Sequence, residues 1–248
     1  MLLQLATWQE VDTYLERSRG VIIPIGSTEQ HGPLGLIGTD ALCPEVIAKG
    51  ISERIDAMVA PTLSIGMAQH HLAFAGSISL RPSTLIAVVR DVVQSLARHG
   101  FERCYFLNGH GGNVATVSAA FSEIYADASF DRSGSNHPGM RCKLSNWYTA
   151  PGVKRLSGKL FGGSEGSHAT PSEISLTYFA YPEAVKSATQ SPKIAPTGPI
   201  LDADDYRRRF PDGRIGADSS LATIEAGEQL YEAAVGDIAK DYEEFVKS

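Results

Sequence analysis

Histidine and carboxylate side chains gather in two glycine-rich segments of the sequence. Residues 26–40 read GSTEQHGPLGLIGTD and contain Glu29, His31 and Asp40. Residues 108–113 read NGHGGN and contain His110. Imidazole mixed with carboxylate is a donor set typical of Zn, Mn or Fe(II), whereas Ca and Mg sites are normally built from oxygen alone. These four side chains therefore predict a divalent-metal site.

The spacing of these residues favours their convergence on one point. Glu29 and His31 are two residues apart, so on an extended backbone both project to the same side. Asp40 can return to them across a loop built on glycine and proline. The glycines around His110 let the backbone come close to a bound ion. An E-x-H pair alone is common by chance, so the prediction depends on both segments together.

The elements that must hold these segments alternate between strand and helix. The sequence predicts strands at 20–26, 57–65, 103–107 and 140–147, with a possible short strand at 74–80. It predicts helices at 8–19, 40–54 (capped by Asp40), 83–99, 114–125, 171–179 and 221–246. This rhythm is typical of an α/β fold with a mostly parallel sheet covered on both faces. No repeat or linker divides the chain, so residues 1–248 are expected to form a single domain, with 187–219 as an extended excursion.

Both segments follow predicted strands. Because ligands of open α/β sheets bind beyond the carboxyl ends of the strands, the two segments are expected to meet there. His70 and His71 are adjacent, so in an extended segment only one can face the site, and His71 is the expected one. His99 and His137 are assigned no catalytic role. NGHGGN has neither the P-loop spacing nor the dinucleotide fingerprint, so nucleotide binding is not expected.

Composition restricts the partners. The formal net charge of -6 provides no basic footprint, so nucleic acid is not expected as a partner. No apolar stretch approaches the roughly 20 residues of a membrane span, and the first residues show no basic leader. Cys43, Cys104 and Cys142 form no C-x-x-C pair and are typical of reduced thiols. A cytoplasmic protein without a membrane partner is expected.

Four motifs, in this order, resemble the creatininase (creatinine amidohydrolase) family. They are PIGSTEQHGP followed by TD, then HLAFAGSISL, NGHGGN and SHATPSEISL, and they extend from Pro24 to Leu176. The resemblance implies a three-layer α/β/α fold, a binuclear divalent-metal site, hydrolysis of amide or cyclic amide C–N bonds, and a homohexamer.

The resemblance also implies roles for individual residues. Glu29 and His110 correspond to terminal ligands of one metal, His31 to a ligand of the other, and Asp40 to the carboxylate that bridges both.

Two residues outside the glycine-rich segments gain a role only through the resemblance. His168 is the expected proton shuttle, and Glu173 is expected to be a further metal ligand or an acid behind the ligands. Without the resemblance, His168 would be an ordinary loop histidine and Glu173 a first-turn helix glutamate. His71 and Ser77 are expected to line the pocket mouth.

The second segment departs from creatininases proper, which resemble NGH-Tyr-Glu-Asn there. Gly111 and Gly112 replace a tyrosine that helps to hold substrate and a glutamate that ligates the second metal. Both glycines are expected to line the substrate pocket. Ser164 replaces a tryptophan that packs on the substrate ring. These departures favour a substrate other than creatinine, and they leave one or two ions per subunit open, with Glu173 as the candidate replacement ligand.

The sequence therefore predicts a metal-dependent amidohydrolase that uses activated water on a small-molecule amide, cyclic amide, formamide or peptide-like substrate. The glycine variant is similar to family members that act as formamide hydrolases in flavin-type biosynthesis or as peptidases maturing a peptide-derived cofactor. Two alternatives stay open. One is a hydrolase of another bond, such as a phosphoester, although none of the four motifs offers Arg or Lys to an anion. The other is a non-catalytic metal-binding scaffold with the same fold.

Overall fold

A four-stranded parallel sheet forms the centre of the computed structural model, which describes residues 1–131 and 139–248. The strand order is β2-β1-β3-β4. The strands are β1 (Gly20–Ile25), β2 (Met58–Val59), β3 (Arg103–Asn108) and β4 (Arg141–Asn146). Ile25 pairs with Asn108, which pairs with Asn146, so the carboxyl ends of β1, β3 and β4 are level.

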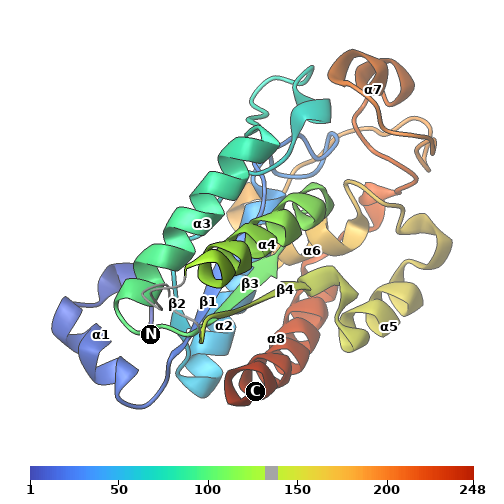
Figure 1. Ribbon diagram of the computed structural model, residues 1–248. Helices are drawn as coiled ribbons and strands as arrows, with labels where there is room; N and C mark the ends of the chain where they lie inside the picture. Colours follow the sequence, from blue (N-terminus) through green and yellow to red (C-terminus); the bar gives the residue numbers. More distant parts are fainter. Residues whose placement is uncertain (132–138) are drawn as a thin grey trace.

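Helices cover both faces of this sheet (Figure 1). One face carries α2 (Thr39–Ile55), α5 (Pro151–Leu160), α6 (Pro171–Ala180) and α8 (Ile224–Lys247). The other carries α1 (Trp8–Leu15), α3 (Pro82–Arg98) and α4 (Val114–Phe130). Alternate strand residues supply the two cores, since Ile22 packs in the first and Val21 and Ile23 pack in the second. The predicted α/β fold, with helices on both faces of a parallel sheet, is confirmed.

The connections around β1 create a crevice at the carboxyl edge. The chain passes from β1 to β2 through α2 on one face, and from β2 to β3 through α3 on the other. β1 and β3 therefore flank the topological switch point, where the following loops separate and leave room for a ligand. The two glycine-rich segments leave the sheet at this point.

Several predicted elements need correction. Of residues 57–65, only Met58–Val59 form a strand, and Leu63 makes an isolated bridge to Ile25. Pro61, two residues after Val59, has no N–H to extend the ladder. Residues 74–80 form no strand; Gly76 turns the chain with φ of 89°, and Ile78 makes a single bridge to Thr28.

Two helices were not predicted. One is α5, and the other is α7 (Ala203–Arg209), which lies within the expected excursion 187–219 and begins where Asp202 accepts a hydrogen bond from the N–H of Asp205. Short 3₁₀ turns occupy Leu3–Leu5, Gln69–His71, Gly111–Asn113, Trp147–Thr149, Gly162–Ser164, Pro182–Ala184 and Ser219–Leu221.

Asp40 does not cap α2 as predicted. The N-cap is Gly38, which has no side-chain hydrogen bond, and Asp40 is the second residue of the helix. Its carboxylate turns instead toward His31 and His110. The start of α2 therefore has no side-chain cap, and the buried Asp40 carboxylate lies at the carboxyl edge of the sheet.

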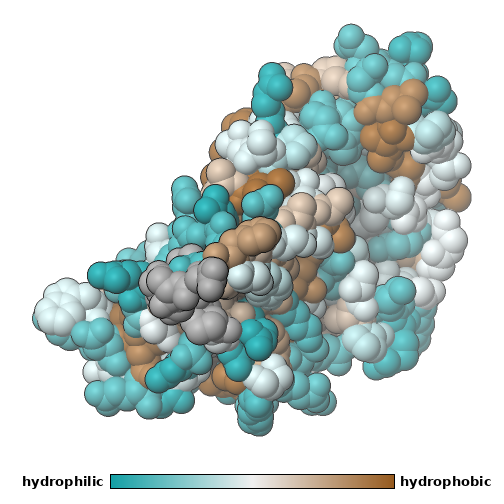
Figure 2. Space-filling view, viewed as in Figure 1, coloured by the Kyte–Doolittle hydropathy of each residue, from teal (hydrophilic) through white to brown (hydrophobic). Residues whose placement is uncertain are grey.

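Hydrophilic side chains cover most of the face seen in Figure 2, and hydrophobic ones form separate patches. In the described ranges, no helix combines the length and the apolar character that a bilayer span requires. The three cysteines are free thiols, as predicted. His137 lies outside the described residues.

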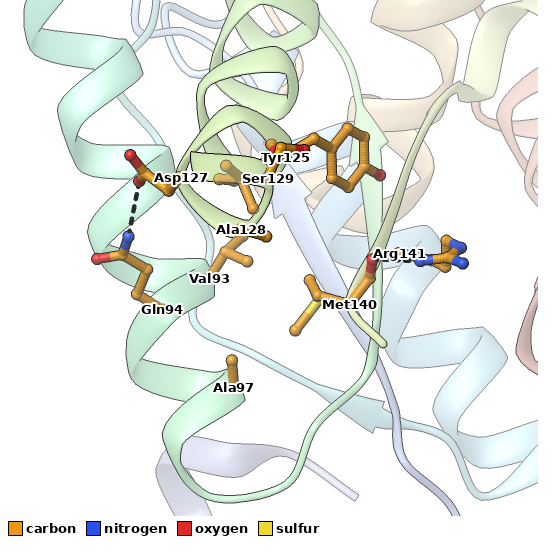
Figure 3. A pocket seen from close by; sticks show the side chains of 10 residues that line it. Val93, Gln94, Ala97, Tyr125, Asp127, Ala128, Ser129, Met140 and Arg141 are labelled. Carbon is orange, nitrogen blue, oxygen red and sulfur yellow. Dashed lines mark hydrogen bonds between the residues drawn. The ribbon is translucent and has the colours of Figure 1, made fainter. Parts of the chain in front are cut away.

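A cleft of about 280 Å³ lies between α3 and α4 (Figure 3), and none of the metal-ligand candidates lines it. Val93, Ala97 and Met140 contribute to its wall. Its carboxylate, Asp127, pairs with Arg90 at 2.7 Å and accepts a hydrogen bond from Gln94 at 3.2 Å. None of its described lining residues is a histidine, so the chemistry expected from the sequence does not belong to this cleft.

Candidate metal centre

Six predicted site residues converge at the carboxyl edge of the sheet. Their ligand atoms form three groups in which all atoms lie within 4.8 Å of one another: Glu29, Asp40 and His110; His31, Asp40 and Glu173; and Glu29, His31 and His168. Asp40 belongs to both of the first two groups. The structure therefore brings together all the residues that were predicted as ligands.

Asp40 lies between two imidazoles. Its Oδ1 is 3.1 Å from Nε2 of His31, and its Oδ2 is 2.8 Å from Nδ1 of His110. Burial raises the pKa of Asp40, but the two histidines outweigh burial and hold the pKa well below its usual range. The carboxylate stays ionised and available to a cation.

Two glycines fix the position of Asp40. A Cβ added at Gly26 or at Gly109 would lie 2.0 Å from the main-chain oxygen of Asp40. These glycines follow β1 and β3 directly, so the first turn of α2 can pack against both strand ends. Only glycine permits this approach of backbone to backbone.

Glu29 is fully buried beside three side chains. Ser27 donates a hydrogen bond to its Oε2 at 2.7 Å, and Nε2 of His110 lies 3.3 Å from the same oxygen. Nε2 of His71 lies 3.0 Å from Oε1. Burial raises the pKa of Glu29, and the charge of His110 works against this effect.

The side chains present fit a divalent metal. Glu29 Oε1 and Asp40 Oδ2 are buried, and neither receives a hydrogen bond of acceptable geometry from a described residue, although imidazole nitrogens lie close. Buried polar atoms are normally satisfied, and unsatisfied ones mark sites that a ligand completes. A cation among these oxygens and imidazoles would satisfy both atoms, and the mixed donor set suits Zn, Mn or Fe(II).

We expect metal uptake to release protons. Burial lowers the pKa of His31 and His110, but Asp40 and Glu29 outweigh it and raise the values to about 10 and about 9. Both imidazoles are thus protonated at pH 7 without metal, and ligation requires them neutral. Loading should release about two protons at pH 7, and the affinity should rise with pH up to about 10, where His31 has lost its own proton. Calorimetry in two buffers of different ionisation enthalpy measures this; metal uptake without proton release would contradict it.

Glu173 lies beside His31 and Asp40. Its Oε1 is 3.9 Å from Nε2 of His31 and accepts a hydrogen bond from the N–H of Thr170 at 2.6 Å, within a capping box at the start of α6. Burial raises the pKa of Glu173 to about 7. The helix start therefore orients a third donor for the group that contains His31.

Gln30 connects two further histidines. Its side-chain nitrogen lies 2.9 Å from His71 Nδ1, His168 Nε2 and the Gly213 carbonyl oxygen. The main-chain oxygen of Gln30 is 2.8 Å from His168 Nε2. A carbonyl only accepts, so we assign the His168 proton to Nε2.

The remaining assignments follow from the two amide protons of Gln30. One goes to Gly213 and the other to His71 Nδ1, so His71 carries its own proton on Nε2, facing Glu29. Burial, with the charge of His31, holds the pKa of His168 well below its usual range. His168 is therefore neutral, and its Nδ1 lone pair faces Glu29 Oε1 at 3.8 Å.

We expect Gln30→Met to disturb these histidines. The variant keeps the length of the side chain but cannot donate to His71 or Gly213. Loss of a residue that hydrogen-bonds to the histidines of a metal site typically costs 10- to 100-fold in metal affinity or activity, and we expect a loss on that order. Nitrogen-15 NMR should show His71 leaving the Nε2–H form. Gln229→Met, on the exposed face of α8, is the control; an unchanged His71 spectrum in Gln30→Met would refute the assignment.

A cavity of about 680 Å³ opens onto these groups. His71, Gly111 and Gly112 line it, as predicted. His70 lines it too, which corrects the expectation that only one of the two histidines faces the site. That expectation assumed an extended backbone, whereas Gln69–His71 form a 3₁₀ turn.

Ser77 has a different place from the one predicted. Its Oγ accepts a hydrogen bond from the main-chain N–H of Gln30 at 3.2 Å, and it lies outside the lining of the cavity. Sequence reasoning missed Tyr148 and Lys154, which line the cavity, and Tyr206 of α7, whose ring lies 4.6 Å from that of His71. None lies in a motif, and no sequence signal marks them.

Known proteins resemble this chain over nearly its full length. The family model described as creatininase (creatinine amidohydrolase) matches residues 4–242. The chain belongs to the creatininase family. Creatinine amidohydrolase from Pseudomonas putida is 29% identical, over 94% of this chain and 92% of that protein. A solved creatininase described as "Creatininase Mn" has a TM-score of 0.84 and 26% identity, covering 98% of each chain. A mutant creatininase of "Zn-Zn type" has the same TM-score and 25% identity, again with 98% of each chain covered.

Family members differ in the substrates that their names state. A mycofactocin precursor peptide peptidase from Mycobacterium ulcerans is 27% identical over 88% of this chain and 82% of that protein. A 3-dehydro-scyllo-inosose hydrolase from Thermotoga maritima is 24% identical over 96% of this chain and 81% of that protein. Membership of the creatininase family therefore establishes the fold and a hydrolase family, but not the substrate.

The creatininase-family fold here leaves no room for a side chain at Gly112. An added Cβ would lie 2.4 Å from Nε2 of His110 and 2.6 Å from the main-chain oxygen of Met67. At Gly111 the nearest atom would be the Tyr148 hydroxyl at 3.7 Å. The two glycines thus differ, since Gly112 packs tightly behind His110 and Gly111 has room for a Cβ.

Proposed function

We propose that this creatininase-family chain is a metal-dependent amidohydrolase that cleaves a C–N amide bond in a cyclic amide, formamide or small peptide-like substrate. The observation that carries the proposal is the sharing of Asp40 by two ligand groups at the edge of a cavity. Glu29, Asp40 and His110 would hold one ion, and His31, Asp40 and Glu173 a second. Glu173 would supply the donor that Gly112 does not.

A divalent ion bound here would polarise a carbonyl and lower the pKa of a water molecule. The side chains would complete the reaction around it. His168, neutral and with its Nδ1 lone pair toward the cluster, would accept a proton from the attacking water and pass it to the leaving nitrogen. Gln30 would hold His168 in the tautomer that this step requires.

The cavity favours a substrate larger than a small cyclic amide. Its volume of about 680 Å³ lies within the range of sites for drug-sized ligands. Gly111 and Gly158 leave part of the wall open, since an added Cβ meets nothing within 3.4 Å at the first and nothing within 4 Å at the second. We therefore expect formamides with a bulky substituent or short peptides to fit better than creatinine.

Lys154 bears on the phosphoester alternative. Among the described lining residues it is the one Lys or Arg, and its side chain is exposed on α5 rather than set among the ligands. A phosphoryl group bound at the metals would therefore meet no Lys or Arg side chain among the described ligand residues. Amide hydrolysis is better supported, and Lys154 is placed to meet an anionic substituent of the substrate.

The experiment is a screen of formamides, cyclic amides and short peptides against protein loaded with Zn or Mn. Elemental analysis should give nearly two ions per chain, and turnover of at least one amide class should disappear on chelation and return with metal. Full activity in a metal-free preparation would refute the mechanism, and two bound ions without turnover of any amide would favour the scaffold alternative.

His168→Ala separates two roles of that histidine, because His168 also belongs to a ligand group. If it moves protons, the variant should keep its metal content while the turnover of a screened amide falls by about 10²- to 10⁴-fold. Loss of an ion from the variant would show instead that His168 is a ligand.

A further inference from the structure

Tyr148 presents its hydroxyl to the cavity beside the metal ligands. It lies in the 3₁₀ turn that follows β4, and it lines the same cavity as Asp40, His110 and Glu173. A Cβ built at Gly111 would meet the Tyr148 Oη at 3.7 Å, so the hydroxyl lies over the residue next to His110. The absence of a side chain at Gly111 keeps the space around this hydroxyl open.

The hydroxyl has no hydrogen-bond partner among residues 1–131 and 139–248. Other tyrosines near the site are satisfied, since Tyr206 donates to the Gly213 carbonyl at 2.7 Å and Tyr178 to that of Leu34 at 2.8 Å. Tyr148 is half-buried, and its hydroxyl is open to the cavity. The open donor of Tyr148 is therefore available to a molecule in the cavity.

The hydroxyl also keeps its proton. Burial raises the pKa of Tyr148 to about 12, and the nearby charges of Asp40 and Glu173 act in the same direction. Its ring lies edge-on to Trp147, with centroids 6.2 Å apart, and Trp147 is buried. Tyr148 is thus a neutral donor on a rigid support, which is the arrangement that stabilises developing negative charge most effectively.

We infer that the Tyr148 hydroxyl donates a hydrogen bond to the substrate's carbonyl oxygen as that oxygen becomes the oxyanion of the tetrahedral intermediate. This inference rests on the proposed amidohydrolase function. The hydroxyl keeps its proton throughout, and the bond to the oxygen strengthens as negative charge develops there. Tyr148 therefore favours the transition state over the bound substrate.

The test compares metal-loaded wild type, Tyr148→Phe and the control Tyr181→Phe, which changes a tyrosine outside the cavity lining. Two monoanionic probes are titrated by calorimetry: ethyl methylphosphonate, which is tetrahedral, and propionate, which is planar. Tyr148→Phe should bind the phosphonate about 10- to 100-fold more weakly, the loss expected for a hydrogen bond to a charged group. Propionate affinity and metal content should stay within about threefold of wild type, and Tyr181→Phe should match wild type for both probes.

Three outcomes would overturn the inference: unchanged phosphonate binding in Tyr148→Phe, equal weakening of both probes, or no phosphonate binding by the metal-loaded wild type. The proposed function fails by different readouts, namely missing metal or missing amide turnover in the wild type. With a substrate in hand, Tyr148→Phe should lower kcat and leave KM nearly unchanged.

Discussion

Asp40→Asn is expected to remove the metal and the hydrolytic activity together. Asp40 is shared by both candidate ligand groups, and its two oxygens lie 3.1 Å and 2.8 Å from the imidazoles of His31 and His110. An amide keeps the shape but binds cations poorly. Turnover should fall by about 10³-fold or more, because several kcal/mol of transition-state stabilisation depend on the metal.

The fold of Asp40→Asn should stay nearly intact, because His31 and His110 can lose their protons once the carboxylate is neutralised. Elemental analysis, circular dichroism and turnover of the substrate found in the screen measure these effects. Asp91→Asn, on the exposed side of α3, is the matched control. An Asp40→Asn protein with two ions per chain and wild-type turnover would disprove the shared-ligand arrangement.

Gly26→Ala is expected to destabilise the protein and misplace Asp40. The new methyl carbon would lie 2.0 Å from the main-chain oxygen of Asp40 and 2.5 Å from the nitrogen of Ala41, both of them backbone atoms that cannot rotate away. The helix start must shift, so we expect a loss of about 3 kcal/mol in the free energy of unfolding. For a chain of this length that corresponds to a Tm lower by roughly 6 to 12 °C.

Gly109→Ala meets the same oxygen of Asp40 at 2.0 Å from the other strand and should behave alike. Gly163→Ala is the control, since nothing lies within 4 Å of the added carbon. Thermal unfolding and metal content measure the result. If Gly26→Ala and Gly163→Ala unfold at the same temperature, the close packing of α2 on the strand ends contributes nothing to the stability of the protein.

Much of this protein follows from residue type and order. Alternating apolar strands and amphipathic helices determine a parallel sheet with two covered faces, because each element must bury its apolar side. Glu29, His31, Asp40 and His110 could be identified as ligand candidates because donor chemistry belongs to the side chain itself. The family motifs added His168 and Glu173, which spacing alone could not distinguish from ordinary loop and helix residues.

The tertiary structure decided which distant residues share the cavity. Tyr148 and Lys154 reach it from elements outside the motifs, and Tyr206 of α7 packs against His71. His70 faces the cavity because a 3₁₀ turn replaced the expected extended backbone. Asp40 lies among the ligand candidates and does not cap α2, because Gly26 and Gly109 let the start of α2 pack against two strand ends. Local sequence specifies chemistry and periodicity, but distances between residues far apart in the chain depend on how the layers pack.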